Sequence, residues 1–272
     1  MAKDYFQDKV ALISGGSRGV GFALAKRLVE RGAKVVISAR GEKRLLDSQA
    51  KLKKMGGEVE AVVGDVGKWE DAKKMVERAI ESFGRLDILI NNAGVSMRGD
   101  FAELAPEVCE RVVATNLLGS IYLSRAGIKH LRRTKGSLVF ISSIAGLFGL
   151  PGASIYCATK GALKGLCESL RIELSQDGVH IGIVYLGFTE HDPEKRILLA
   201  DGSLAPPDRP AHHTQDYAAH LILKLIEKRK SQLVMTPIGK LGFFINRFFP
   251  GFVEKAIIFA RKHELTIYKR FS

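Results

Sequence analysis

The sequence of 272 residues contains no uninterrupted run of about 18 apolar residues, the length that a helix needs to cross a bilayer. We therefore expect no membrane-spanning helix, and residues 1–9 are too highly charged for a secretory signal. Cysteine is scarce, because only Cys109, Cys157 and Cys167 are present and no two of them form a Cys-x-x-Cys pair. These features predict reduced thiols in a cytoplasmic protein.

The sequence also lacks a nucleic-acid-binding motif and a dominant basic run, although its formal net charge is +13. The excess positive charge therefore favours a phosphate-bearing cofactor or an acidic lipid surface over nucleic acid. His191, His212 and His213 lie in one polar stretch, but adjacent histidines rarely converge on one ion without further ligands. We expect no metal site. With 46% hydrophobic residues, the chain can bury a full core.

A glycine-rich turn follows an apolar run at residues 9–14 and opens an amphipathic helix. Gly15 permits a tight turn, Gly19 lets the backbone approach a diphosphate, and Gly21 lets the helix pack closely on the strand. The free N–H groups of the helix N-terminus suit an anion. A second strand at residues 34–40 follows within about 30 residues, a combination that predicts a dinucleotide-binding unit.

The end of the second predicted strand indicates which dinucleotide is bound. An NAD site places an acidic residue there, on the ribose 2′-hydroxyl, whereas this sequence has Arg40. Arg18 and Ser17 in the glycine loop suit a 2′-phosphate. We therefore favour NADP(H) over NAD(H). The alternative is that Arg40 only solvates the end of the strand. Glu42 lies close in sequence and could serve as the acidic residue of an NAD(H) site.

Helical and strand patterns alternate along the rest of the chain without a repeat or a linker. Strands are predicted at residues 59–64, 86–90, 139–143, 179–186 and 233–235, and helices at 45–55, 71–83, 106–129, 154–176 and 217–230. This order predicts a single α/β domain over residues 1–237, a doubly wound parallel sheet (Rossmann fold) with helices on both faces.

Small and polar residues follow two of the predicted strands. Asp65 and Val66 are placed where a carboxylate and a backbone N–H meet an adenine, although Asp65 can equally cap a helix. Asn92, Ala93 and Gly94 follow the strand at 86–90 and would lie where a buried strand meets a crevice. Asn side chains there can also tie neighbouring strands together.

The residues that suggest chemistry are a tyrosine and a lysine four positions apart, Tyr156 and Lys160. This spacing puts them one turn apart on the same side of a helix. A fixed positive charge lowers a phenol pKa by about 1–3 units, so the phenol can exchange a proton with a reacting oxygen. Ser143 ends the strand at 139–143 and can direct a hydroxyl to that oxygen. Asn116 lies inside an apolar helix and should be hydrogen-bonded.

Together these motifs resemble the classical short-chain dehydrogenase/reductase family, nearest its 11β-hydroxysteroid dehydrogenase and 3-ketosphinganine reductase-like branches. The matching pieces, in family order over residues 8–190, are Ser14-Gly15-x-x-x-Gly19-x-Gly21, Asn91-Asn92-Ala93-Gly94, Asn116, Ser143 and Tyr156-x-x-x-Lys160. The resemblance implies that Tyr156 is the general acid and that Ser143 polarises the carbonyl. It also implies that Lys160 holds the nicotinamide ribose and lowers the Tyr156 pKa. Asn116 would help to hold a proton-relaying water.

The strand-end pattern and the resemblance together imply a set of cofactor contacts. They are Gly15, Ser17, Arg18, Gly19, Val20, Gly21, Arg40, Asp65, Val66, Asn92, Ala93, Gly94, Tyr156, Lys160, Gly187 and Thr189. One stretch departs from the family, since Leu186 replaces a usual proline and His191 stands where a threonine is often found. Thr189 comes two residues early, so its backbone is the alternative contact for the nicotinamide.

The last third of the chain changes in character. Residues 188–212 are polar and proline-containing, and the resemblance makes them a lid over the substrate. Residues 238–272 hold half of the 14 phenylalanines, interspersed with lysine and arginine, and Pro250-Gly251 divides them into two helices. This tail suits a bilayer interface, and it can equally pack on its own domain or on a second subunit.

The predicted function is an NADP(H)-dependent oxidoreductase that reduces a ketone or aldehyde to an alcohol, or catalyses the reverse reaction. The resemblance suggests an apolar carbonyl substrate of a lipid, steroid or retinal type, and a homodimer or homotetramer. We expect a cytoplasmic location, with peripheral membrane contact left open. The alternative is a non-catalytic dinucleotide-binding regulator or a membrane-peripheral scaffold.

Overall fold

The computed structural model describes residues 4–190, 192–207 and 211–263. A seven-stranded sheet lies at its centre in the order β3-β2-β1-β4-β5-β6-β9, and neighbouring strands pair in parallel. The strands are β1 (Val10–Ser14), β2 (Lys34–Ala39), β3 (Val59–Val63), β4 (Ile88–Asn91), β5 (Ser137–Ser143), β6 (His180–Leu186) and β9 (Gln232–Val234). The predicted doubly wound parallel sheet is confirmed.

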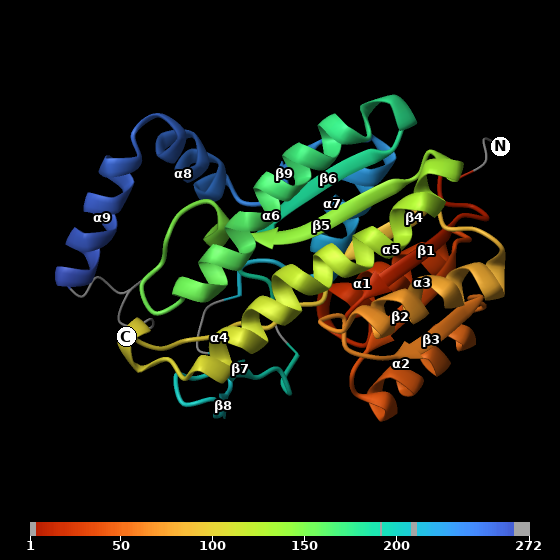
Figure 1. The fold of residues 1–272 in the computed structure, drawn as a ribbon, viewed down its shortest axis with the longest axis horizontal. Coiled ribbons are helices and arrows are strands. Elements are labelled where there is room, and N and C mark those ends of the chain that lie inside the picture. The colour runs from red at the N-terminus through yellow and green to blue at the C-terminus, as the bar shows by residue number, and fades with distance from the viewer. Residues whose placement is uncertain (1–3, 191, 208–210, 264–272) are drawn as a thin grey trace.

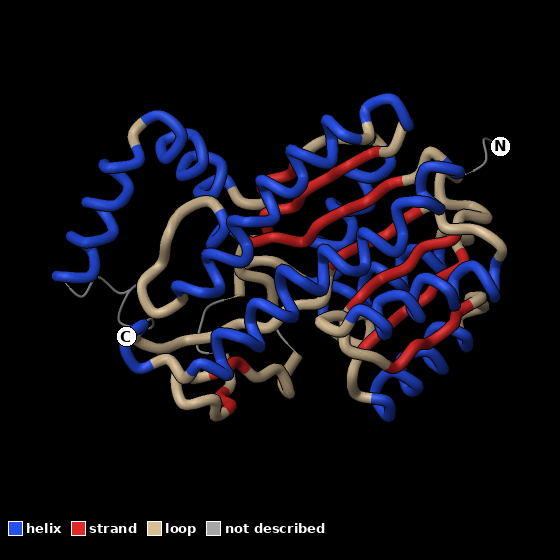
Figure 2. Tube along the Cα trace, in the orientation of Figure 1, coloured by secondary structure: helices blue, strands red, loops and turns tan. Residues whose placement is uncertain are grey.

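Helices cover both faces of this sheet, as Figures 1 and 2 show. The first layer contains α1 (Gly19–Glu30), α2 (Glu42–Lys54) and α7 (Gln215–Glu227); the second contains α3 (Trp69–Phe83), α5 (Gly119–Thr134) and α6 (Ser154–Glu173). Side chains of β1 alternate between the two layers, with Ala11 and Ile13 on one side and Val10 and Leu12 on the other. Burial on both faces explains why the strands read as apolar runs.

The helix predicted at residues 106–129 is interrupted by a π-helical turn. It consists of α4 (Pro106–Val113), the π turn η2 (Ala114–Leu118) and then α5, which continues to Thr134. A π turn inserts one extra residue into the helical repeat and often marks a functional site. Asn116 lies within this turn.

Strand order reverses between β1 and β4, because β1 pairs with β2 on one side and with β4 on the other. In open α/β sheets, ligands bind outside the carboxyl ends of the strands at such a switch point. Ser14 ends β1, Asn91 ends β4 and Ser143 ends β5. These strand ends therefore define the place for a site.

The segment predicted as a lid contains a short antiparallel hairpin, β7 (Ile197–Leu198) with β8 (Leu204–Ala205). Its strands are too short for a sequence pattern to reveal. Short 3₁₀ helices occur at η1 (Phe101–Glu103), η3 (Ile144–Gly146) and η4 (Ser175–Asp177).

The tail forms two helices, α8 (Pro237–Phe248) and α9 (Pro250–Lys262), with the break at the predicted proline. Figure 1 shows them at one end of the molecule, with α9 standing apart from the sheet. In the described part of the chain, no helix combines the length and apolar character needed to cross a membrane.

Candidate active site

A cavity of about 1510 Å³ opens at the carboxyl ends of the strands. The glycine loop, the ends of β4 and β5, the start of α6 and the lid segment line it. All the site residues predicted from the sequence line this cavity, with the exception of Asn116. The fold therefore brings together residues from position 15 to position 189, as a dinucleotide site requires.

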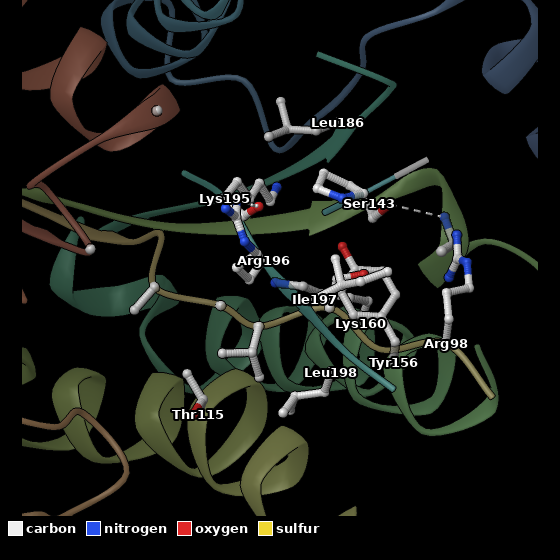
Figure 3. A pocket seen from close by; sticks show the side chains of 18 of the residues that line it. Arg98, Thr115, Ser143, Tyr156, Lys160, Leu186, Lys195, Arg196, Ile197 and Leu198 are labelled. Carbon is white, nitrogen blue, oxygen red and sulfur yellow. Dashed lines mark hydrogen bonds between the residues drawn. The ribbon is translucent and has the colours of Figure 1, made fainter. Parts of the chain in front are cut away.

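Tyr156 and Lys160 lie in the first turns of α6. The Lys160 Nζ atom is 5.9 Å from the centroid of the Tyr156 ring, and it donates a hydrogen bond of 2.9 Å to the carbonyl oxygen of Ile141 in β5. Lys160 is buried, whereas Tyr156 is half-buried. Figure 3 shows both side chains at the cavity together with Ser143.

Burial lowers the pKa of Lys160. Desolvation disfavours the ammonium form, and the charge of Lys195 acts in the same direction as a smaller cause. Together they lower the pKa of Lys160 from 10.5 to about 8. Near neutral pH the lysine is still mostly protonated. It can therefore place a positive charge beside the Tyr156 ring from within the protein interior.

Ser143 ends β5 in an extended conformation, and its Oγ accepts a hydrogen bond of 3.2 Å from the Ala145 N–H. This bond uses an oxygen lone pair, so the hydroxyl proton remains a donor for a ligand. The neighbouring Ser142 Oγ donates to the Lys160 carbonyl at 2.9 Å, which fixes β5 against α6. A Cβ at Gly146 would lie 2.7 Å from that same carbonyl, so the contact requires glycine.

Asn116 is fully buried beneath the cavity and does not line it. Its Oδ1 accepts from the Val95 N–H at 2.8 Å, and its Nδ2 donates to the Val95 carbonyl at 2.9 Å. Nδ2 also lies 3.3 Å from the Thr159 hydroxyl. These contacts join the π turn, the loop after β4 and α6, so the Asn116 side chain positions the loop beside Lys160.

The glycine loop has the backbone geometry that the sequence predicts. Gly15 has φ +67° and Gly19 has φ +60°, both in the left-handed region that favours glycine. A Cβ at Gly21 would lie 2.3 Å from the Gly15 carbonyl oxygen, whereas one at Gly19 would meet nothing within 4 Å. The Asn92 Nδ2 donates to the Ser14 carbonyl at 2.9 Å, so this side chain ties β4 to β1.

The N-terminus of α1 fits an anion. Arg18 occupies the N-cap position and its side chain makes no capping hydrogen bond, so the first N–H groups of α1 lack the usual side-chain acceptor. The open space at Gly19 lets a diphosphate approach them. On these observations the residues present fit a dinucleotide.

Arginines gather at the end of β2 and the start of α2. An Arg40 Nη1 atom lies 3.6 Å from an Asp65 carboxylate oxygen. Arg44 pairs with Asp192 at 3.5 Å and with Glu194. Burial lowers the pKa of Arg18, and the nearby charges of Arg44 and Arg40 lower it further. The cluster therefore places three guanidiniums, two of them paired with carboxylates, where the sequence predicts a ribose phosphate.

Arg98 is a cavity residue that the sequence analysis did not identify. It lies beside Tyr156 in Figure 3, and burial lowers the pKa of its guanidinium against the opposing influence of Tyr156 and Cys157. Its Nη1 donates to the Met97 carbonyl at 3.0 Å. Arg98 and Arg44 follow Gly94 and Arg40 by four residues each. That spacing was the only available signal, and it does not indicate a site by itself.

The structure bears on two further residues from the sequence analysis, Asp65 and Thr189. Asp65 does not cap α3, because the N-cap is Lys68; its Oδ1 instead accepts from the Gly67 N–H at 2.9 Å. Thr189 is buried, lines the cavity and forms a β-bridge with His213. His191 lies outside the described residues. Within the described ranges, no group of three or more His, Cys, Asp or Glu residues is arranged to hold a metal.

Comparison with known proteins agrees with this geometry. The family model for short chain dehydrogenase matches residues 9–199. An uncharacterized oxidoreductase of Thermotoga maritima is 37% identical over 188 residues, covering 69% of this chain and 74% of that protein. The 11-beta-hydroxysteroid dehydrogenase-like 4A of Arabidopsis thaliana is 40% identical over 196 residues, covering 71% of this chain and 65% of that protein.

Two solved structures share the fold. A short chain dehydrogenase/reductase from Burkholderia phymatum in complex with NAD superimposes with a TM-score of 0.80 at 24% identity, over 91% of this chain and 95% of that one. An alcohol dehydrogenase from Thermococcus sibiricus complexed with 5-hydroxy-NADP superimposes with a TM-score of 0.74 at 27% identity, over 84% of this chain and 96% of that one. The chain belongs to the short-chain dehydrogenase/reductase family of oxidoreductases, whose fold binds NAD or NADP.

Proposed function

We propose that this protein is an NADP(H)-dependent carbonyl reductase that interconverts an apolar ketone or aldehyde and its alcohol. The observation that carries the proposal is that Tyr156, Lys160 and Ser143 line the same cavity as the glycine loop. A binding protein needs the glycine loop but not a hydroxyl, a phenol and a buried ammonium at its far end. This argues for catalysis over a regulatory role.

The proposed mechanism assigns one task to each of these residues. The reduced nicotinamide supplies a hydride to the carbonyl carbon when the cofactor is bound. Ser143 donates its hydroxyl proton in a hydrogen bond to the carbonyl oxygen, which polarises the carbonyl. Tyr156 transfers its phenolic proton to the same oxygen as negative charge develops there.

Positive charge beside Tyr156 makes the phenol a better acid. The Lys160 ammonium lies 5.9 Å from the ring centroid, and the Arg98 guanidinium is a second cation near the ring. Both favour the phenolate that remains after proton transfer. We also assign Lys160 to the nicotinamide ribose. The Asn116 side chain is engaged with Val95, so it acts on the reaction by positioning this loop.

We assign the opposite end of the cavity to the adenosine half of NADP(H). Gly15, Gly19 and Gly21 would hold the diphosphate against α1, while Asp65 and Val66 would contact the adenine. Arg40, with Arg18 and Ser17, would bind the 2′-phosphate through charge-assisted hydrogen bonds. The gathering of the Arg18, Arg40 and Arg44 guanidiniums supports NADP(H) over NAD(H).

An apolar substrate suits the part of the cavity near Tyr156. Leu150 and Leu198 pack in one cluster with Tyr156. Leu204 and Pro206 of the lid segment also line the cavity. Hydrophobic lining with a few directed polar groups is the usual composition of a small-molecule site. A homodimer or homotetramer remains a prediction.

The test is a substrate screen that follows NADPH absorbance with 3-oxo lipids, steroids and retinal. Parallel assays with NADH, and without a carbonyl compound, serve as controls. We expect carbonyl-dependent oxidation of NADPH with at least one apolar class and slower oxidation of NADH. Tight NADPH binding without turnover on any class would instead favour the non-catalytic regulator.

A further inference from the structure

The tail helices present an apolar face that the rest of the described chain does not cover. Side chains that are more than half exposed include Phe244 (61%), Phe248 (57%), Phe249 (65%), Phe252 (65%) and Phe259 (59%). Leu241 and Ile258 add to the same two helices at 61% and 58%. Exposed apolar side chains at this density mark an interaction surface.

The helix α8 is anchored to the rest of the domain. Its Phe243 ring lies 6.5 Å from the Tyr185 ring, and its Asn246 Nδ2 donates to the Leu147 carbonyl at 2.8 Å. By contrast, α9 has no buried residue and packs against α8. Packing of the tail on its own domain therefore buries part of one side of α8 and leaves the other five phenylalanine side chains of the two helices exposed.

The same helices carry a strong excess of positive charge. Between residues 237 and 263 the cations are Lys240, Arg247, Lys255, Arg261 and Lys262, and the one carboxylate is Glu254. Lys255 follows Phe252 by three residues and precedes Phe259 by four, so it lies one turn from both rings. Lys262 lies one turn beyond Phe259. Basic side chains thus border the aromatic rows.

We infer that the exposed face of α8 and α9 is a docking surface for a bilayer that contains anionic lipid. Phenylalanine rings enter the boundary between headgroups and acyl chains, while lysine and arginine contact lipid phosphates. A second copy of this chain is a poorer occupant, because a two-fold contact would bring two sets of cations together. Lysine is also depleted at protein interfaces.

The docking surface borders the cavity that holds Tyr156. Arg261 of α9 lines this cavity, and a Cβ at Gly242 of α8 would lie 3.2 Å from the Phe148 ring in the loop before α6. A docked protein would therefore hold its cavity at the lipid surface. This step rests on the proposed function, and it implies a carbonyl substrate that partitions into the bilayer.

The experiment is flotation of the full chain with vesicles of phosphatidylcholine, alone or mixed with phosphatidylserine. We expect binding to the mixed vesicles that weakens in high salt. A variant with Phe244→Ser, Phe252→Ser and Phe259→Ser should bind more weakly, by on the order of tenfold for each ring that buries fully. The matched control is Ile172→Ser, since Ile172 is 77% exposed on α6.

A second variant tests the charge. Lys255→Glu with Lys262→Glu should lose about fivefold in affinity for each unit of charge changed, whereas the exposed control Lys51→Glu on α2 should bind as the parent does. Equal binding of the parent and the triple phenylalanine variant would overturn the inference. So would an absence of vesicle binding together with a dimer, measured by light scattering, that the triple variant dissociates.

Two further measurements separate this inference from the proposed function. Circular dichroism and thermal melting should be the same for the parent and the tail variants, because the substituted side chains are exposed. Flotation needs no turnover, so vesicle binding without activity on any carbonyl would retain the docking surface and refute the reductase. Turnover of a water-soluble carbonyl without any vesicle binding would support the reductase and refute the docking surface.

Discussion

Replacing Lys160 with methionine should stabilise the protein while abolishing its activity. Lys160 is 5% exposed, and its ammonium is held in the interior beside the Tyr156 ring. Methionine has a similar length, carries no charge and fills irregular space readily. The substitution therefore removes the buried charge and leaves little cavity, so the energetic effect of the charge can be measured directly.

The magnitude follows from the pKa. Burial lowers the pKa of Lys160 from 10.5 to about 8, and each pH unit corresponds to about 1.4 kcal/mol. The charge therefore opposes folding by about 3 kcal/mol near neutral pH. Loss of the hydrogen bond to Ile141 offsets about 1–2 kcal/mol of this gain. We expect Lys160→Met to raise the free energy of unfolding by about 1–2 kcal/mol.

The pH dependence has a definite sign. Between about pH 8 and pH 10.5 the folded chain has released the Lys160 proton while the unfolded chain retains it. The unfolded state binds more protons in this window, so the stability of the parent rises with pH there. The methionine variant lacks this rise of about 3 kcal/mol, so its advantage of about 1–2 kcal/mol should vanish within the window and become a deficit of about 1–2 kcal/mol near pH 10.5.

The assay is urea unfolding of the ligand-free protein, followed by tryptophan fluorescence at several pH values. Lys160→Ala is the control that leaves a cavity, and it should be less stable than Lys160→Met. A methionine variant that is less stable than the parent near neutral pH would refute the reasoning. So would a stability difference that does not change between pH 8 and pH 10.5.

Three other substitutions test separate parts of the account. Arg40→Asp should shift the NADPH/NADH ratio of kcat/KM by about 10–100-fold toward NADH, the value of one or two charge-assisted hydrogen bonds, and an unchanged ratio would remove Arg40 from its role. Gly21→Ala places a Cβ 2.3 Å from the Gly15 carbonyl oxygen, so thermal melting should show a loss of about 1–3 kcal/mol and NADPH binding should weaken; parent-like stability and affinity would contradict the close packing. Tyr185 has a buried hydroxyl with no hydrogen-bond partner among the described residues. The free energy of unfolding of Tyr185→Phe should therefore be higher than that of the parent, or lower by no more than about 1 kcal/mol. A loss of more than about 2 kcal/mol would reveal a partner.

The sheet was predictable because short stretches of sequence carry the patterns that specify it. Strands that are buried on both faces read as apolar runs, and the glycine loop needs left-handed backbone at Gly15 and Gly19. The cavity also followed from the sequence, since parallel strands place Ser14, Asn91 and Ser143 at one edge. Strand direction alone brings these residues together.

Other features depend on packing that no local pattern encodes. The π turn at Asn116 changes the helical repeat by only one residue, which hydrophobic spacing does not resolve. Arg98 and Arg44 stand out only when the folded chain sets them near Tyr156 and Arg18. The sequence also left open whether the tail packs on its own domain, on a second subunit or on a bilayer. The finding that α9 buries no residue argues against packing of α9 on its own domain.

The most direct test of the central claim is the variant Tyr156→Phe, which removes one hydroxyl and keeps the ring against Lys160. The measurement is single-turnover reduction of a carbonyl substrate at saturating NADPH, with cofactor binding followed separately by fluorescence. We predict that NADPH binds as it does to the parent and that reduction falls by at least about 100-fold, the usual contribution of a positioned general acid. Reduction at the parent rate would contradict the assignment of Tyr156 as the proton donor.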